Sequence, residues 1–95
     1  MPEMHFRVRW PDDTVTDCYS PSLVVKEHLE EGRSYALADF VQRSATALNI
    51  GSERVRAKYG FACSSALDQL RRIEEMAARF DASADPVVRV ESFTP

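Results

Sequence analysis

The run MHFRVRW at residues 4–10 alternates strictly between apolar and polar side chains, and it constrains the fold more than any other feature. A period of two indicates a β-strand with one buried face and one basic face turned to solvent. The sequence PDD at 11–13 predicts a turn. TVTDCY at 14–19 is rich in β-branched and aromatic residues, which suit a second strand. The N-terminal fifth of the chain therefore predicts a β-hairpin.

The next segment, YSPSLVVKEHLEEG at 19–32, fits a helix less firmly. Ser20 can serve as an N-cap, Pro21 suits the first helical position, and Gly32 stands where a C-terminal cap belongs. The residues between them would also suit a strand, so the sequence leaves 21–30 open between helix and strand.

A firmer helical period begins at Ser34. Its apolar residues fall on one side of a helix: Leu37, Phe40, Val41, Ala45 and Leu48. NIGS at 49–52 interrupts the period, because Gly51 can end one helix and Ser52 can start another. The sequence thus predicts a separate short helix over 53–59.

Gly60 follows that helix in a position typical of a left-handed C-terminal cap, and Phe61 is expected to fold back onto the preceding turn. A last helix begins at Ser64 or Ser65, where Ser65 and Asp68 approximate a capping box. Its expected apolar stripe is Leu67, Leu70, Ile73, Ala77 and Phe80. After the connection DASADP at 81–86, the run VVRVESF at 87–93 predicts a final strand.

These elements predict one α+β domain over residues 1–95, because separate cores need more chain than this. We expect a three-stranded, mainly antiparallel sheet in the order 2-1-3, with three to four helices packed on one face. In that sheet the second and last strands are edges, and open edges are templates for strand addition by a partner or by a second copy of the chain.

Composition narrows the class of protein. Twelve Lys and Arg against fifteen Asp and Glu give a net charge of −3, which argues against a nucleic-acid partner because such binding depends on neutralising phosphates. The sequence has neither an apolar run of membrane-spanning length nor a recognisable secretory signal, so we expect a cytoplasmic protein with no membrane partner. Cys18 and Cys63 are expected to be free thiols in that compartment.

A helix-turn-helix DNA reader is one hypothesis that the residues raise. A short basic helix with Arg54, Arg56 and Lys58 leads through Gly60 to a second helix, as in DNA-binding helix pairs. The second helix, however, carries balanced charges and the chain is acidic overall. The sequence therefore favours a capped helix corner over this hypothesis.

Cys63 is the candidate for a reactive residue. It lies at or just before a helix start, where backbone amides can favour a thiolate, and Ser64 and Ser65 add hydroxyl groups. A catalytic cysteine also needs a base, and neither His5 nor His28 has a route to it that the sequence shows. The alternatives left open are a reactive thiol, in a small enzyme or a redox sensor, and a packed core residue.

No cofactor is expected, because the sequence has no glycine-rich phosphate loop and no paired ligand spacing. The four residues that a zinc site would need are scattered singly, at 5, 18, 28 and 63.

A cationic interaction surface is the remaining candidate. Arg7 and Arg9 form a basic row on the first strand, which Asp17 and Glu91 can offset across neighbouring strands. Together with the three cations of the 53–59 segment, this row forms the candidate surface: Arg7, Arg9, Arg54, Arg56 and Lys58.

Three long stretches carry a resemblance: MPEMHFRVRWPD, CYSPSLVVKEHLEEG and GSERVRAKYGFACSSALDQLRRIE. They resemble a family of small bacterial proteins described as nitrogen-starvation response proteins, first catalogued in mycobacteria. The resemblance implies a gene cluster that also encodes a nitrilase-like carbon–nitrogen hydrolase, a radical S-adenosylmethionine enzyme and an acetyltransferase-like protein. It implies no catalytic residues. We therefore expect an accessory protein without enzymatic activity, which contacts a protein partner such as an enzyme of that cluster, or itself as a homodimer.

Overall fold

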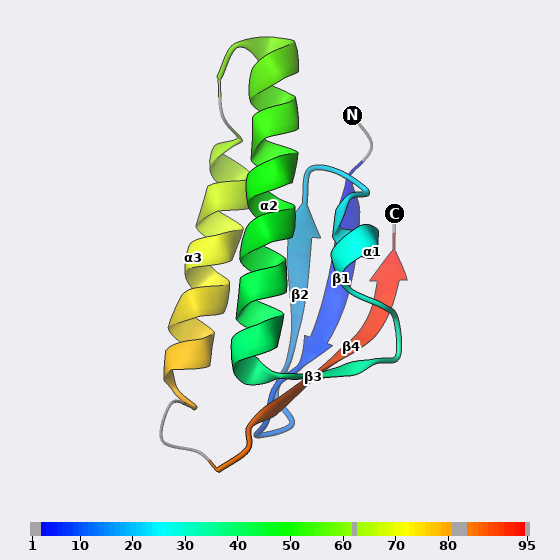
Figure 1. The fold of residues 1–95 in the computed structure, drawn as a ribbon, viewed down its shortest axis with the longest axis vertical. Coiled ribbons are helices and arrows are strands. Elements are labelled where there is room, and N and C mark those ends of the chain that lie inside the picture. Colours follow the sequence, from blue (N-terminus) through cyan, green and yellow to red (C-terminus); the bar gives the residue numbers. More distant parts are fainter. Residues whose placement is uncertain (1–2, 62, 81–83, 95) are drawn as a thin grey trace.

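A layer of helices covers one face of an antiparallel sheet (Figure 1). The computed structural model describes residues 3–61, 63–80 and 84–94, so the first half of the predicted 81–86 connection lies outside the described residues. The elements in chain order are β1 (Met4–Arg9), β2 (Val15–Ser20), α1 (Val25–His28), β3 (Ser34–Ala36), α2 (Leu37–Tyr59), α3 (Ser64–Ala78) and β4 (Val87–Thr94). The predicted α+β class is confirmed, with three helices in the described residues.

The predicted N-terminal hairpin is confirmed. β1 pairs with β2 in antiparallel register, and the turn closes through the Trp10 N–H, which donates to the Thr14 carbonyl at 2.8 Å. Phe6 and Val8 are fully buried under the helices, whereas Arg7 lies on the open face of the sheet. The alternation in the sequence thus gives the correct inner face of the central strand.

The sheet has four strands in the order 2-1-4-3, so the prediction of three strands in the order 2-1-3 is wrong. The additional strand is β3, which was predicted as the start of a helix. Tyr35 at its centre is buried and pairs with Val88 of β4. The long-range pairing with β4 therefore outweighs the helical spacing that begins at Ser34.

β4 lies inside this sheet rather than at its edge, which corrects the prediction that the last strand has an open edge. β3 pairs with its first half. Beyond β3, the Gly32 N–H donates to the Val90 carbonyl at 2.7 Å, and the Phe93 N–H donates to the Glu31 carboxylate at 3.0 Å. The segment before β3 therefore protects this side of β4 from strand addition.

The open question over residues 21–30 resolves into a single helical turn, α1. Ser20 is no helix cap: its hydroxyl donates to the Ser22 carbonyl at 2.7 Å, which closes a local turn. Such side-chain bonds compete with helix formation at the position where the helix was expected to begin. The chain is extended again at Leu29.

Helix α2 runs without a break, so the predicted interruption at 49–52 and the separate helix over 53–59 are wrong. Gly51 lies within the helix and is buried, and a Cβ atom there would stand 3.1 Å from Cγ of Pro21. The glycine therefore permits a close approach of two segments rather than a helix end. Gly60 does cap α2 as predicted, with φ of 86° and its N–H bonded to the Arg56 carbonyl.

Helix α3 begins at Ser64, one of the two predicted starts, but its predicted capping box is wrong. Cys63 is the N-cap residue, without a side-chain capping bond. The Asp68 carboxylate instead pairs with Arg71 at 2.6 Å and with Arg72 at 3.0 Å. The apolar stripe is also corrected, because Leu67 is an exposed residue while Ala66 of the same turn is buried.

Ser44 provides a first test of the packing. Its hydroxyl is fully buried in α2 and has no hydrogen-bond partner in the described structure. A buried polar group without a partner destabilises the fold, and alanine is the better helix former. We therefore expect Ser44→Ala to raise the free energy of unfolding by about 1–2 kcal/mol. Urea denaturation of both proteins measures the difference, and a destabilised variant would contradict the described packing.

Cys18 provides a second test, through pH. Burial raises the pKa of its thiol from the ordinary 9.0 to about 11, because the thiolate cannot be hydrated inside the core. The unfolded chain loses this proton near pH 9 and the folded chain keeps it, so stability falls as pH rises from 9 to 11. The shift corresponds to about 2–3 kcal/mol. Unfolding curves across this range should show the fall in the wild type and a smaller one in Cys18→Ala.

Candidate functional site

The basic row on β1 is neutralised. Nε of Arg7 lies 3.1 Å from the Asp17 carboxylate, and Nε of Arg9 lies 2.7 Å from that of Glu91. Both acidic partners are those that the sequence suggested. The bond to Glu91 raises the pKa of Arg9, which keeps the pair ionised. An anionic partner would have to compete with these carboxylates, so the row is a weak candidate for its binding site.

The three other predicted cations lie at the C-terminal end of α2, which extends past the sheet and past the start of α3 (Figure 1). The structure does not combine them with Arg7 and Arg9, because that pair lies on the face of the sheet that points away from the helices. The candidate surface of five cations therefore divides into two separate parts.

Each cation at the end of α2 has a different environment. Arg54 donates from Nη1 to the Ser22 hydroxyl at 3.1 Å, which ties this helix end to the segment before α1. Nζ of Lys58 lies 5.5 Å from the ring centroid of Tyr59. Nε of Arg56 lies 3.7 Å from the Glu53 carboxylate in an exposed ion pair. At about 100° per residue, Arg56 points to the side opposite Arg54 and Lys58. Cations thus surround the helix end rather than forming one stripe.

Three exposed apolar side chains lie at the same end of the α2–α3 hairpin. Phe61 is 68% exposed, Tyr59 is 51% exposed and Leu67 is 44% exposed. The prediction that Leu67 joins the core is therefore wrong, and most of the Phe61 ring lies in solvent beside the cap at Gly60. We call residues 53–61 and 63–67 the hairpin tip.

The hairpin tip differs in charge from the rest of the molecule. It carries three cations and one anion, whereas the whole chain has a net charge of −3. Its aromatic residues were not predicted as surface residues. Gly60 marks the end of α2 in the sequence, but it gives no signal that Phe61 is exposed, because the residue after such a cap usually contacts the preceding turn.

Within the hairpin tip, Cys63 turns toward the core. Its backbone N–H donates to the Ser52 hydroxyl at 3.2 Å, and its side chain packs against the core. Burial raises the pKa of the neighbouring Tyr19, and the charges of Cys63 and Glu3 add to this effect. The Tyr19 phenol beside the thiol thus stays protonated at neutral pH, so it cannot act as the base that a catalytic cysteine needs. This arrangement favours the packed-residue alternative.

His5 reaches the region around Cys63 only through Tyr19, whose ring it meets edge-on at 5.8 Å between centroids.

Within residues 3–61, 63–80 and 84–94, the structure has no group of three His, Cys, Asp or Glu side chains placed to hold a metal ion. In the same residues, no helix has the length and apolar character needed to cross a membrane.

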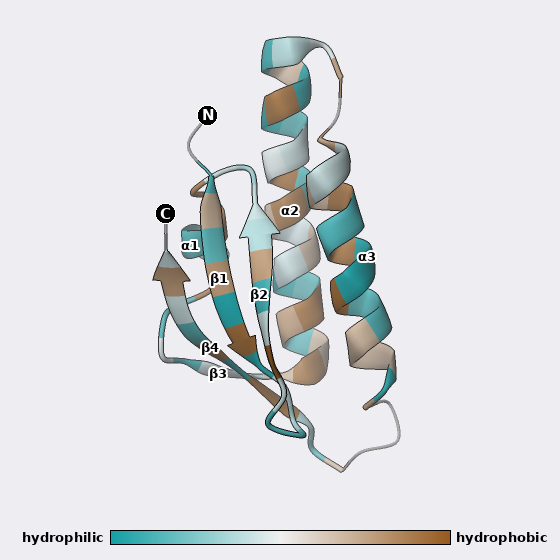
Figure 2. Cartoon of the chain, turned by 180° about the vertical axis from the view of Figure 1, so that it is seen from behind, coloured by the Kyte–Doolittle hydropathy of each residue, from teal (hydrophilic) through white to brown (hydrophobic). Residues whose placement is uncertain are grey.

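The helix pair behind the DNA-binding hypothesis has a different form from the one expected. α2 and α3 run antiparallel and side by side along the molecule, which both Figure 1 and Figure 2 show. A helix-turn-helix instead crosses two short helices at about 90–120°. The short basic helix that motivated the hypothesis is the end of the long helix α2.

Comparison with known proteins places the chain in a family. The family described as nitrogen starvation-induced protein NitG matches residues 5–93, which is nearly the whole chain. No curated protein and no solved structure matches it. The chain therefore belongs to the NitG family of nitrogen starvation-induced proteins, and the resemblance seen in the sequence is confirmed.

Proposed function

We propose that this member of the NitG family is an accessory protein of the nitrogen-starvation response, which acts by binding another protein rather than by catalysis. The observation that carries the proposal is the hairpin tip. Exposed aromatic and aliphatic side chains gather there beside cations, at the end of a helix that extends past the rest of the fold.

Physical chemistry supports an interface at this place. Single exposed apolar residues are common on protein surfaces, but a group of them beside polar residues marks an interaction site. Aromatic residues and arginine are also the types most enriched where binding energy concentrates. Phe61 and Tyr59 supply the apolar area, and Arg56 supplies an exposed cation, whose ion pair with Glu53 is also exposed and contributes little.

The charge of the hairpin tip defines the chemistry of its partner. A basic patch on an acidic protein favours a partner surface that is acidic around an apolar pocket, because opposite potentials speed association and exclude other surfaces. We propose a protein induced in the same response, such as an enzyme encoded in the same gene cluster. A homodimer is the alternative, in which the acidic remainder of a second copy would meet the tip.

Affinity capture from nitrogen-starved cells tests this proposal. We expect the wild type to retain a partner, and Phe61→Ser and Arg56→Glu to recover at least tenfold less of it. Phe61→Ser removes the apolar part of the contact, and Arg56→Glu removes the electrostatic part. Arg89→Glu is the matched control, since it reverses an exposed cation on β4 away from the tip. Equal recovery with all four proteins would contradict the proposal, and light scattering separates a homodimer from a different partner.

The same capture separates binding from thiol chemistry. Cys63→Ser keeps the size of the side chain and removes the thiol, so a binding protein should keep both its partner and its role in the starvation response. Loss of that role, with the fold and the partner retained, would favour the reactive-thiol alternative instead.

A further inference from the structure

The outer edge of β2 lies away from the hairpin tip. This strand pairs only with β1 in the described sheet. The Tyr19 N–H points outward, where it donates to the Gln69 side chain at 3.1 Å. Backbone groups point to the same side at every second residue of a strand, so the N–H and C=O groups of Val15 and Asp17 also point outward, where no strand meets them.

Helix α3 runs beside this edge and leaves a groove of about 370 Å³ between them. In Figure 2, β2 forms the border of the sheet on the side of α3. The groove is lined by Trp10, Thr16, Asp17, Cys18, Gln69, Arg72, Ile73 and Met76. Its floor is apolar and well buried, and Arg72 stands at its rim with 70% of its side chain exposed.

We propose that this groove binds an extended segment of a partner protein, which adds to β2 as a further strand. The backbone of the segment would pair with Val15 and Asp17, and one apolar side chain would enter the groove onto Trp10. An open strand edge beside a helix supplies both parts of such recognition, because main-chain bonds give affinity and a pocket selects alternate side chains. This site goes beyond the proposed function, since it uses none of the residues of the tip.

The occupant is a peptide segment rather than the β2 strand of a second copy. The Gln69 side chain already accepts the Tyr19 N–H, so only the stretch from Val15 to Asp17 remains for pairing with another strand. A symmetric pairing of two sheets would also bring the α3 helices together. That contact would bury Arg72 and its ion pair with Asp68, which costs free energy, whereas a single extended segment leaves the pair in water.

Random linear peptides displayed on phage are the probe for this site. We expect the wild type to enrich peptides with an apolar residue, and Asp17→Pro to bind the best of them at least tenfold more weakly. Proline removes an outward N–H that the sheet itself does not use. Asp17→Ala is the matched control, because it loses the same carboxylate and keeps the N–H, so it should bind like the wild type.

Amide hydrogen exchange of the wild type gives a second readout, which decides the question even if Asp17→Pro fails to fold. The bound peptide should slow exchange at Val15 and Asp17. Enrichment of no peptide, equal binding by Asp17→Pro in a folded state, or protection elsewhere would overturn the proposal. A wild-type dimer that Asp17→Pro abolishes would also overturn the proposal, because the edge would then bind a second copy of the chain. The tip variants Phe61→Ser and Arg56→Glu should bind the peptide normally, so the two sites fail independently.

Discussion

Trp10→Ala is expected to lower the free energy of unfolding by about 4 kcal/mol, in the range measured for large aromatic residues replaced in a core. Trp10 is only 2% exposed, and it meets the Phe40 ring edge-on at 5.6 Å and the Phe80 ring in a stack at 6.3 Å. Its indole N–H also donates to the Thr16 hydroxyl at 2.9 Å. The substitution removes these contacts and leaves a cavity where β1 meets both long helices.

Urea denaturation measures this loss, and Phe61→Ala is its matched control. Phe61 is also aromatic but lies exposed at the tip, so its replacement should change stability by less than about 0.5 kcal/mol. Equal destabilisation by the two variants would contradict the assignment of Trp10 to the core and of Phe61 to the surface.

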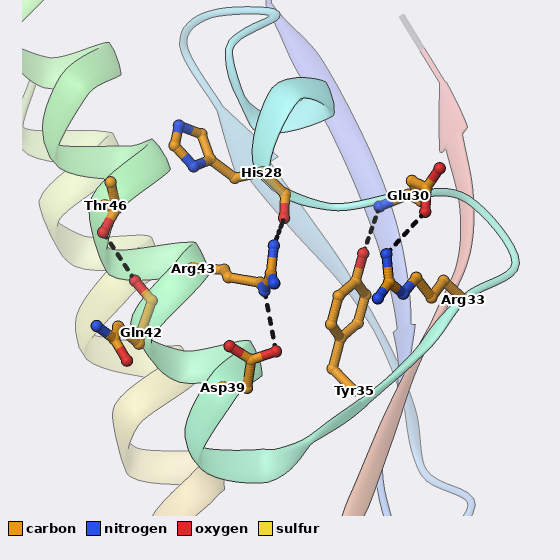
Figure 3. Close-up of polar contacts among 8 residues, drawn as sticks. All are labelled: His28, Glu30, Arg33, Tyr35, Asp39, Gln42, Arg43 and Thr46. Atoms are coloured by element: carbon orange, nitrogen blue, oxygen red, sulfur yellow. Dashed lines mark hydrogen bonds and ion pairs between the residues drawn. The ribbon is translucent and has the colours of Figure 1, made fainter.

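Tyr35→Ala is expected to have the second-largest effect, about 3 kcal/mol, together with the loss of β3. Figure 3 shows Tyr35 between the segment that precedes it and α2. Its hydroxyl accepts the Glu30 N–H at 2.8 Å, and the Arg33 and Arg43 guanidinium groups each lie 5.2 Å from the centre of its ring. Without this ring, the segment that covers β4 has lost its main anchor, so β4 would become an open edge.

Tyr35→Phe separates the contribution of the Tyr35 ring to stability from that of its hydroxyl group. It keeps the ring and removes the bond to the Glu30 N–H, so we expect a loss of about 1 kcal/mol. Amide exchange at Val88 and Phe93 reports whether β4 opens. Slow exchange there in Tyr35→Ala would contradict the anchoring role of the ring.

The cluster around Tyr35 explains why β3, the additional strand of the sheet, could not be predicted from the sequence. Arg43 joins α2 to α1, because its guanidinium donates to the His28 carbonyl at 3.2 Å and to the Asp39 carboxylate at 2.9 Å (Figure 3). Such contacts depend on residues that are distant in sequence. A three-residue strand directly before a helix has too short a pattern to reveal them.

Gly51 illustrates the same limit within a helix. Its low helix propensity suggests a break, but the structure uses its lack of a side chain to bring Pro21 close. By contrast, the β1–β2 hairpin and the cap at Gly60 could be predicted because local patterns determine them. The ion pairs of Arg7 and Arg9 could be anticipated as well, since the predicted sheet places strands with acidic residues on either side of β1.

The candidate site was predictable only in part. The cations of the 53–59 segment were found, because charge is visible in the sequence. The exposure of Leu67 was not, because its spacing from Leu70 suggested the apolar stripe of α3, whereas the buried residue of that turn is Ala66, about 100° around the helix from Leu67. The groove beside β2 was also missed, since it depends on the distance between a strand and a helix that lie far apart in the chain.

Site-specific photo-crosslinking in nitrogen-starved cells tests the central claim most directly. A photoreactive phenylalanine analogue at position 61 would lie on the proposed interface, and the same analogue at position 87 is the control. Val87 is another exposed apolar residue, but it lies on β4 away from the tip. We predict a discrete crosslinked partner protein from position 61 and none from position 87. Absence of a crosslink at 61, or the same product from both positions, would contradict the proposal that the hairpin tip binds a protein.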